Sequence, residues 1–373
     1  MKKLGVVSYN IYGNFTNYGS ALQSWALHTA IRKYSDGKVE PILMDYCPDI
    51  LADKDPLNPL KNLWDKDEES RKMCELSMPA IKENYKKFDR FYHEEFNRSK
   101  NKYDSSNFDE CVEKEGLDGF VCGSDTIFCV DEFGIDDGYY ANYSSMKNGY
   151  TVSYAASFGD SHFDDNSYKI LDERLKNFKA IGIRESGMVN YIKERVNVPV
   201  QKVIDPTLLL DVEEYDEIIE PKRLIEDKYL LLYVRRHNPK MTAYAEKLAK
   251  DNGWKAVEIS LRATNADHNI MYYKAGIEEF LSLVKNAEYV VTNSFHGAIF
   301  AVQFRKEFVI FSREQCDTKV YELLSMFGIL DRLLVSGEEE LYKAIDYNLV
   351  FENIKREREK SIAFLKNELE GCK

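Results

Sequence analysis

The chain has 373 residues, of which 44% are hydrophobic and 31% are charged, as in folded globular proteins. This length exceeds what a single hydrophobic core usually supports, so we expect two domains. The net charge of −12 argues against a nucleic-acid partner, because the phosphate backbone would be repelled. An anionic substrate would need a local group of basic side chains.

No targeting or membrane-spanning segment is expected. The apolar stretch after Lys2 and Lys3 is too short for a signal peptide, and no run approaches the roughly 18 apolar residues of a membrane helix. The seven cysteines are scattered without a C-x-x-C pair, so we expect no disulfide framework, no zinc site and no other metal. These features favour the reducing cytoplasm, with a peripheral membrane contact left open.

In the first half, short aliphatic runs alternate with helical patterns, which is typical of parallel βαβ construction. Strands are expected at residues 4–8, 39–44, 119–122, 151–155, 180–183 and 203–204, and helices at residues 21–33, 170–178 and 186–195. Residues 49–110 interrupt this rhythm with prolines, charges and one predicted helix. We interpret the aromatic stripe of that helix mainly as local packing, the alternative being a surface for a sugar or lipid acceptor. The stripe comprises Phe88, Phe91, Tyr92 and Phe96.

The second half repeats the alternation after an acidic linker at residues 211–227. Strands are expected at residues 229–234, 256–260, 289–292 and 307–311, and helices at residues 241–251, 277–285, 298–304 and 320–327. A charged helix at residues 348–370 carries apolar residues in helical register, and we expect it to pack on the first domain. The predicted units are residues 1–215, residues 226–347 and a returning helix at residues 348–373.

Two Rossmann-like α/β domains facing across a cleft form the architecture of B-type glycosyltransferases, which is the fold that we predict. A single large doubly wound sheet is the alternative. In both layouts ligands bind beyond the carboxyl ends of the parallel strands. The residues directly after each strand are therefore the candidates for chemistry.

Two strand ends near the start carry candidate residues. Asn17, Gly19 and Ser20 lie where a helix begins, so free N–H groups and the helix dipole would favour a phosphate or carboxylate. A glycine needed only for the turn is the alternative. Ser124 and Asp125 follow the strand at 119–122, and Asp125 could act as a general base, bind a sugar hydroxyl or simply cap a turn.

Arg184 and Glu185 follow the strand at 180–183, and the guanidinium of Arg184 offers a planar fork that matches a carboxylate or phosphate. A salt bridge to a neighbouring acid is the alternative for Arg184. Asp205, in Asp205-Pro206-Thr207, is as compatible with a structural role as with a functional one.

Two further motifs lie in the second half. Arg235 and Arg236 end the strand at 229–234 and could form a local anion clamp, although a solvated loop explains them nearly as well. The sharpest motif delivers Asn293, Ser294 and His296 from a buried strand to the start of a helix. Because histidine exchanges protons near neutral pH, His296 is the main candidate for an acid or base.

Six motifs in a fixed order resemble the polysaccharide pyruvyl transferase family, between about residues 4 and 311. They are Asn17-Tyr18-Gly19-Ser20-Ala21-Leu22-Gln23, Gly123-Ser124-Asp125, Tyr154-Ala155-Ala156-Ser157-Phe158-Gly159, Arg184-Glu185, Asp205-Pro206-Thr207 and Asn293-Ser294-Phe295-His296-Gly297. The resemblance implies transfer of the pyruvyl unit of phosphoenolpyruvate onto two hydroxyls of a sugar, forming a cyclic ketal and releasing phosphate. The sugar would belong to a bacterial surface polysaccharide or its lipid-linked precursor, and no cofactor is implied.

The family's Ser-Arg-Leu-His pattern has Ser294 in the place of its arginine here. The donor would then be held by Arg184, Arg235, Arg236 or the helix start at Gly19. The implied chemistry needs an acid for the methylene carbon and a base for the attacking hydroxyl. His296 would be the acid or stabilise the phosphate, and Asp125 or Glu185 would be the base. A nucleotide-sugar glycosyltransferase and a catalytically silent saccharide-binding protein are the alternatives.

Overall fold

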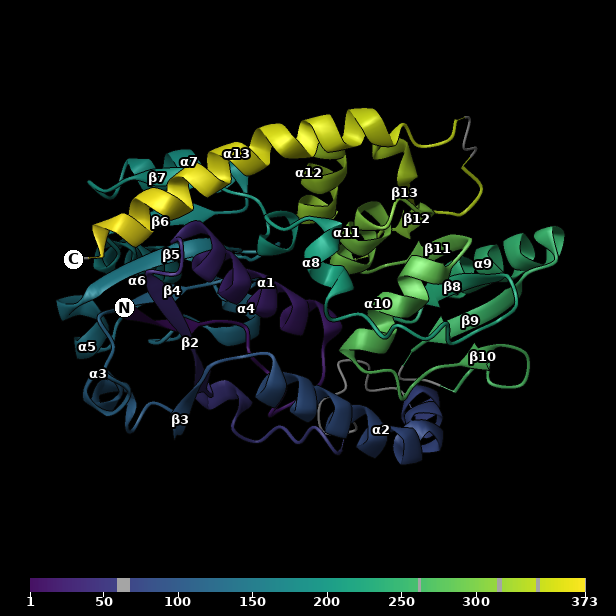
Figure 1. The fold of residues 1–373 in the computed structure, drawn as a ribbon, viewed down its shortest axis with the longest axis horizontal. Helices are drawn as coiled ribbons and strands as arrows, with labels where there is room; N and C mark the ends of the chain where they lie inside the picture. Colours follow the sequence, from purple (N-terminus) through teal and green to yellow (C-terminus); the bar gives the residue numbers. More distant parts are fainter. Residues whose placement is uncertain (59–67, 261–262, 314–316, 340–342, 373) are drawn as a thin grey trace.

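The computed structural model describes residues 1–58, 68–260, 263–313, 317–339 and 343–372. Its strands form two separate parallel sheets, each flanked by helices, and the sheets lie next to each other (Figure 1). This arrangement confirms the predicted pair of Rossmann-like domains and excludes the single-sheet alternative. Within the described ranges no helix is long and apolar enough to cross a membrane.

The sheet of the N-terminal domain has the order β3-β2-β1-β4-β5-β6-β7, with every pairing parallel. The strand order reverses direction between β1 and β4, which is the switch point where ligands bind in such sheets. The strands are β1 (Lys2–Val7), β2 (Val39–Tyr46), β3 (Arg98–Tyr103), β4 (Gly119–Cys122), β5 (Tyr150–Ala156), β6 (Ala180–Ile183) and β7 (Val200–Lys202).

The sheet of the C-terminal domain has the order β10-β9-β8-β11-β12-β13 and is also parallel throughout. Its switch point lies between β8 and β11, so the loop after β8 and the start of the helix after β11 are neighbours. The strands are β8 (Tyr229–Tyr233), β9 (Lys255–Ile259), β10 (Ile270–Met271), β11 (Tyr289–Thr292), β12 (Glu307–Phe311) and β13 (Leu333–Leu334).

The helices follow the predicted alternation, with boundaries moved by a few residues. They are α1 (Tyr18–Tyr34), α2 (Glu68–Glu94), α3 (Cys111–Glu115), α4 (Val130–Phe133), α5 (Ser144–Asn148), α6 (Asp165–Arg174), α7 (Ser186–Lys193), α8 (Val212–Asp216), α9 (Pro239–Asn252), α10 (Ile277–Asn286), α11 (Phe295–Gln303), α12 (Asp317–Phe327) and α13 (Tyr347–Gly371). Short 3₁₀ helices lie in some of the loops, for example at Pro206–Leu208.

Two expectations about the first half are wrong. The strand predicted at residues 203–204 is a loop, because the ladder with β6 ends at Lys202 and the chain turns into the 3₁₀ segment at Pro206. The interruption at residues 49–110 is not wholly an insertion, because it contains β3, which pairs with β2 at the edge of the sheet. Because β3 carries charged residues, the hydrophobic pattern did not indicate a strand there.

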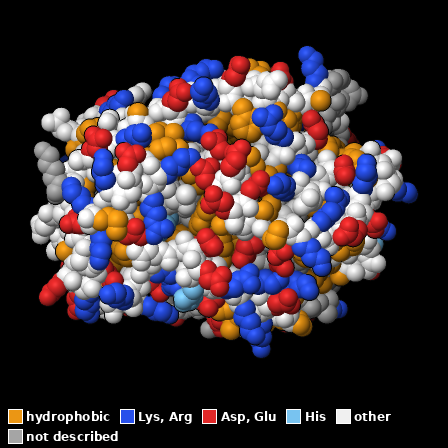
Figure 2. Space-filling model, viewed as in Figure 1, with side chains coloured by type: hydrophobic (Ala, Val, Ile, Leu, Met, Phe, Trp, Pro, Cys, Tyr) orange, Lys and Arg blue, Asp and Glu red, His pale blue; other side chains and the backbone are white. Residues whose placement is uncertain are grey.

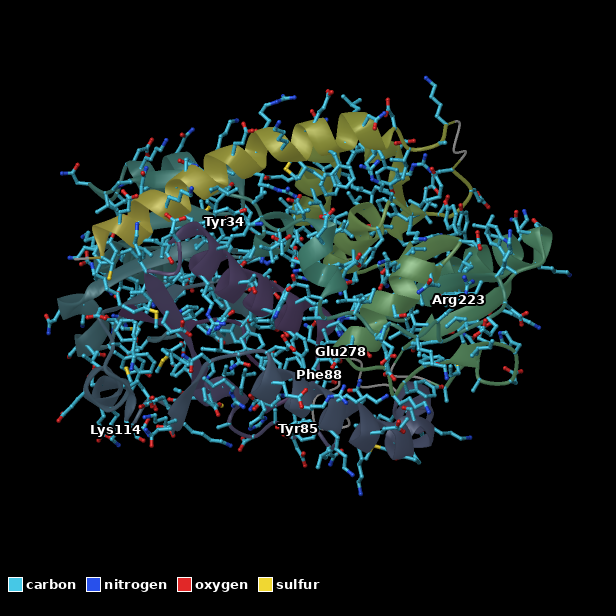
Figure 3. All side chains as sticks on the ribbon, viewed as in Figure 1. Tyr34, Tyr85, Phe88, Lys114, Arg223 and Glu278 are labelled. Carbon is cyan, nitrogen blue, oxygen red and sulfur yellow. The ribbon has the colours of Figure 1, made fainter. Side chains whose placement is uncertain are left out.

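The aromatic stripe of α2 is buried in the main core, which confirms the packing interpretation. The Phe88 ring lies 5.2 Å from the Tyr18 ring of α1. The same helix reaches α10 of the other domain, where Arg90 forms an ion pair with Glu278 at 2.8 Å. Figure 3 labels Phe88 and Glu278 at this junction. Helix α2 therefore joins the two domains.

Helix α13 returns across the N-terminal domain, as predicted (Figure 1). Ser361 accepts a hydrogen bond from the N–H of Ile204 at 3.0 Å, and Glu368 accepts one from the Tyr150 hydroxyl at 2.9 Å. The ring of Phe364 lies against Gly182 of β6, where any side chain would collide with it. The glycine in β6 thus permits the close approach of this helix.

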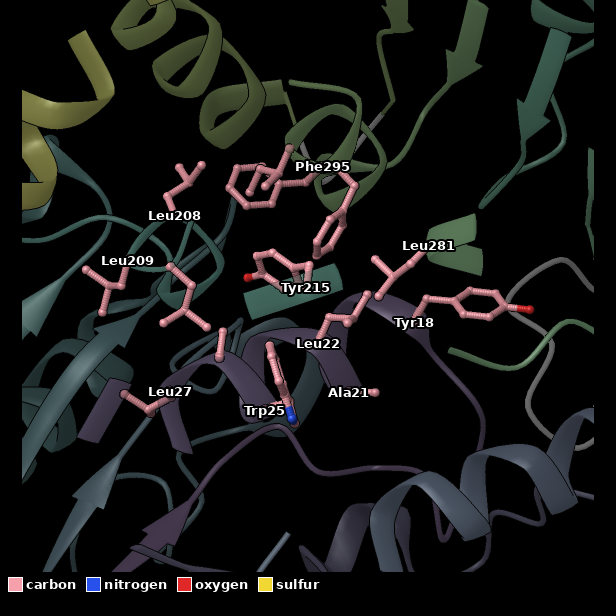
Figure 4. Packing of buried hydrophobic residues seen from close by; sticks show 14 of the residues in the cluster. Tyr18, Ala21, Leu22, Trp25, Leu27, Leu208, Leu209, Tyr215, Leu281 and Phe295 are labelled. Carbon is pink, nitrogen blue, oxygen red and sulfur yellow. The ribbon is translucent and has the colours of Figure 1, made fainter. Parts of the chain in front are cut away.

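The two domains share a hydrophobic core. Tyr215, in the predicted linker, packs with ring centroids 5.4 Å from Trp25 of α1 and 5.1 Å from Phe300 of α11. Figure 4 shows Tyr215 between α1 and the C-terminal domain. The linker is therefore packed between the domains, and the exact domain limits stay a prediction. On the face drawn in Figure 2, acidic and basic side chains alternate without one large patch of a single sign.

Candidate active site

A buried cluster of an aspartate, an arginine and a histidine joins the domains. Asp205, after β7, lies with its Oδ2 2.7 Å from Nη2 of Arg184 and 3.3 Å from Nε2 of His296. Arg184 follows β6 of the N-terminal domain, whereas His296 is in the first turn of α11 in the C-terminal domain. All three side chains are at most 8% exposed. The predicted arginine and histidine therefore meet at one carboxylate.

The carboxylate of Asp205 is ionised in this setting. Burial alone would raise its pKa, but the charges of Arg184 and His296 and a hydrogen bond from Thr207 hold the pKa below the ordinary value. Its second oxygen accepts bonds from the N–H and hydroxyl of Thr207 at 2.9 and 2.6 Å. Asp205 is thus fixed from both sides, and it belongs to the cluster although the sequence left its role open.

Part of this cluster has no hydrogen bond within the described ranges. Nε and Nη1 of Arg184 and Nε2 of His296 are buried without a well-aligned partner there. Burying a polar group without a hydrogen bond costs free energy, unless a ligand or a water molecule supplies the missing bond. The cluster consequently has the character of an anion site: a guanidinium with two unused donors beside an imidazole.

Ser124 and Asp125 lie on the other side of Arg184. The Ser124 hydroxyl accepts a hydrogen bond from Nη2 of Arg184 at 2.7 Å, and Oδ1 of Asp125 lies 3.7 Å from Nη1. The N–H of Ser124 is held by the side chain of Gln23 at 3.1 Å. The predicted residues after β4 and after β6 therefore meet at the carboxyl edge of the sheet, where ligands bind in parallel sheets.

Gly19, in the first turn of α1, lies directly against His296. A Cβ atom added at Gly19 would be 2.3 Å from Nδ1 of the imidazole. The absence of a side chain is what allows His296 to occupy this position. The start of α1 was predicted to bind an anion. Two of its N–H groups, those of Gly19 and Ser20, already donate hydrogen bonds to the Asn17 side chain, so they are not free for a ligand.

A cleft between the domains opens onto this cluster. Arg184, Glu185 and Asp205 line one side, and Phe295 and Lys319 line the other. The Phe295 ring faces both cations, with its centroid 5.3 Å from the Arg184 guanidinium and 5.6 Å from the Lys319 ammonium. The cleft therefore presents two cations beside one ring, although the carboxylates of Glu185, Asp205 and Glu322 also line it.

Glu185 lines the cleft but is committed to the protein. It accepts hydrogen bonds from the Ser157 hydroxyl and from the N–H of Phe158, the latter at 3.3 Å. Burial raises the pKa of Glu185 in spite of the Ser157 hydrogen bond. A carboxylate held by two donors is better suited to fixing the loop after β5 than to exchanging protons with a substrate.

A second recess lies at the carboxyl ends of β8 and β9. It is lined by Arg235, Ser260 and Tyr233 of the C-terminal domain and by Thr16 and Tyr18 of the N-terminal domain. Arg235 therefore faces the space between the domains, as expected of a residue that binds substrate.

The remaining predicted residues hold the backbone. Oδ1 of Asn293 accepts the N–H of Arg235 at 2.8 Å, and its amide donates to the carbonyl of Arg236 at 2.7 Å. Ser294 caps α11 by accepting the N–H of Gly297 at 3.2 Å. Asn293 and Ser294 thus shape the two loops of the C-terminal switch point.

Sequence reasoning missed Lys319, which lines the cleft, and Glu132, which lies near it. Lys319 belongs to α12, an ordinary amphipathic helix, and Glu132 belongs to the four-residue helix α4. Neither stands at a strand end or in a motif, so no sequence signal pointed to them. Gln23 belongs to the first of the six motifs, and its side chain forms hydrogen bonds with Ser8 and Ser124.

Comparison with known proteins gives one family. A family model described as polysaccharide pyruvyl transferase matches residues 17–315, which include every residue of the cluster. No curated protein matches the chain.

Solved structures with the same fold are sugar-nucleotide enzymes. A putative UDP-N-acetylglucosamine 2-epimerase from Listeria monocytogenes superposes with a TM-score of 0.53 and 9% identity, covering 97% of this chain and 91% of that one. A UDP-GlcNAc 2-epimerase from Neisseria meningitidis, bound to UDP-GlcNAc, superposes with a TM-score of 0.51 and 10% identity, covering 99% and 94%. At this identity the likeness shows the B-type glycosyltransferase-like fold alone.

Proposed function

Because the chain belongs to the polysaccharide pyruvyl transferase family, we propose that it transfers the pyruvyl group of phosphoenolpyruvate onto a sugar as a cyclic ketal, with release of phosphate. The acceptor in this proposal is a sugar of a surface polysaccharide or of its lipid-linked precursor. No cofactor takes part, and the reaction takes place in the cytoplasm.

One observation carries the proposal: the buried cluster in which Arg184 keeps two unused donors beside His296. Phosphoenolpyruvate carries a carboxylate and a phosphate, and an arginine fork matches either group. Lys319 supplies a second cation on the opposite wall of the same cleft. The cleft can thus hold both ends of a dianionic donor although Ser294 replaces the family arginine.

The proposed chemistry follows from this arrangement. His296 gives a proton to the methylene carbon while an acceptor hydroxyl attacks the neighbouring carbon. Arg184 and Lys319 stabilise the negative charge of the donor and of the departing phosphate. A second hydroxyl of the same sugar then displaces the phosphate and closes the ketal.

The test is an incubation of the protein with phosphoenolpyruvate and a panel of lipid-linked and nucleotide-linked sugars. We expect a product heavier by one pyruvyl group and an equal amount of free phosphate. His296→Ala should abolish both while leaving the unfolding temperature near that of the wild type. His162→Ala is the matched control, because the His162 side chain is 92% exposed and far from the charged cluster in sequence.

Other outcomes would point elsewhere. Thermal stabilisation by UDP-N-acetylglucosamine but not by phosphoenolpyruvate would replace the proposal with a nucleotide-sugar enzyme. Binding of saccharide without phosphate release from any combination would indicate a silent saccharide-binding protein. Full turnover by His296→Ala would remove the histidine from the mechanism.

A further inference from the structure

We propose that Glu132, on α4, is the general base that takes the proton from the attacking acceptor hydroxyl. This assignment rests on the proposed function and names a residue that neither the motifs nor the family match singles out. It replaces Asp125 and Glu185, which the sequence offered for this role.

Glu132 is placed beside the charged cluster by its own loop. Its Oε2 accepts a hydrogen bond from the Thr126 hydroxyl at 2.9 Å, and Thr126 directly follows Asp125. Phe133, the next residue, packs edge-on against Tyr9 with ring centroids 5.2 Å apart. The helix is therefore anchored in the core, and the carboxylate lies next to the strand end that carries Asp125.

The charges around Glu132 come from both domains. Asp125 and the Tyr9 hydroxyl face it from the loops after β4 and β1, while Lys319 of α12 and Arg313 after β12 face it from the C-terminal domain. Glu132 thus lies near charged groups of both domains, among them Lys319, which lines the cleft. Its side chain is half-buried, which leaves room for a hydroxyl to approach.

This environment suits proton transfer. Burial raises the pKa of Glu132, while Lys319 and the Thr126 hydrogen bond lower it in part. A carboxylate with a raised pKa is a stronger base than a free glutamate.

The two predicted bases are less suitable. Asp125 lies with Oδ1 3.7 Å from Nη1 of Arg184, so its carboxylate already faces a cation of the protein. Glu185 accepts two hydrogen bonds within the protein. Glu132 accepts one described hydrogen bond, from Thr126, and lies near Lys319 of the cleft.

The step balances without a redox partner. The hydroxyl oxygen of the acceptor forms a bond to the central carbon of phosphoenolpyruvate, and its proton passes to Glu132. The electron pair of the carbon–carbon double bond takes a proton from His296 at the methylene carbon. The second hydroxyl of the sugar then forms its bond to the same carbon while phosphate leaves with the electron pair of its carbon–oxygen bond. The proton of that hydroxyl returns to His296, and Glu132 releases its proton to solvent.

The test uses the full chain with phosphoenolpyruvate and the acceptor that gives transfer in the panel above. Glu132→Gln should lower kcat by about 100-fold or more, the usual contribution of a general base, with little change in the stabilisation by phosphoenolpyruvate. Asp131→Asn, on the same helix and paired with the exposed His162, is the control and should keep full activity.

The pH profile separates a base from a structural residue. Activity should fall as the pH drops through the pKa of Glu132, because only the ionised carboxylate accepts a proton. Thr126→Val removes a hydrogen bond that lowers this pKa, so the acid limb should move to higher pH. The assignment would be overturned if activity fell at the same low pH in Thr126→Val as in the wild type and still fell there in Glu132→Gln.

The outcomes also distinguish the two proposals. Transfer by the wild type together with equal transfer by Glu132→Gln would overturn the base and leave the pyruvyl transferase standing. Absence of transfer by the wild type with every acceptor would overturn the function, and the assignment with it.

Discussion

Nδ1 of His296 lies so close to Gly19 that a Cβ atom on the glycine would be 2.3 Å from it. The imidazole comes from the C-terminal domain and the glycine from the first turn of the N-terminal helix α1. Contact between the domains at this point therefore depends on a residue without a side chain. The orientation of the histidine is set partly by that contact.

Replacing this glycine should damage activity more than stability. Gly19→Ala would push the imidazole away from Asp205, and a displacement of about 1 Å in a catalytic group can cost about 100-fold in rate. We expect a loss of that size in phosphate release, measured with phosphoenolpyruvate and acceptor. Gly13→Ala is the control, since a Cβ there would meet no atom within 4 Å. Equal activity of the two variants would contradict the prediction.

Asp205→Asn should destabilise the protein strongly at neutral pH. The change leaves the Arg184 guanidinium buried without its anion, which typically costs about 3–5 kcal/mol. Because the pKa of Asp205 is lowered in the folded protein, its contribution is complete above about pH 4 and is lost only as the pH falls further. Urea unfolding at pH 7 measures the loss, with exposed Asp53→Asn as the control. A change below about 1 kcal/mol would show that the carboxylate is dispensable for folding.

Glu322 of α12 links the domains within the same cleft, which it lines together with Lys319. It accepts bonds from the N–H and hydroxyl of Ser186 at 3.2 and 2.7 Å and lies 2.8 Å from the Lys202 ammonium. Burial would raise its pKa, but the contacts with Lys202 and Ser186 lower it overall.

Glu322→Gln should therefore lower the unfolding temperature at pH 7 by about 2 °C, as expected for about 1 kcal/mol in a chain of this size. The difference from the wild type should shrink as the pH falls below about 4, where the wild-type carboxylate also becomes neutral. Glu357→Gln, whose partner Lys360 is on the same helix, should show no such trend. A difference that is constant with pH would exclude a charge effect.

Phe88→Ala should test whether α2 is part of the folded core. The Phe88 ring is fully buried against Tyr18, so its loss should cost about 3–5 kcal/mol. Calorimetry or urea unfolding measures this, with Tyr321→Ala as the control because Tyr321 is 54% exposed. A small effect would mean that α2 packs independently of the domains.

The sequence was sufficient to predict the fold because both halves alternate strands and helices with clear hydrophobic patterns. The strands that escaped prediction lack such a pattern. β3 carries mostly charged and polar residues at a sheet edge, and β10 and β13 have two residues each. Short or polar edge strands are fixed by their neighbours and not by their own composition.

For the site, His296, Arg184, Ser124 and Asp125 were predicted because they follow strands, and the fold brings them into one cluster. Asp205 was named without a role, because only the fold shows that its carboxylate lies between a cation of each domain. Glu132 and Lys319 could not be predicted, since both lie on helices whose approach to the cleft depends on the packing of the domains.

Helix α13 starts beside α12 of the C-terminal domain and ends on the N-terminal sheet, so the chain crosses between the domains twice. Because two segments of the chain connect the domains, the motion of one domain relative to the other is restricted. These segments leave one axis of rotation and restrict sliding or twisting of one domain over the other. When the cleft closes after opening, His296 would then return to the same place against α1.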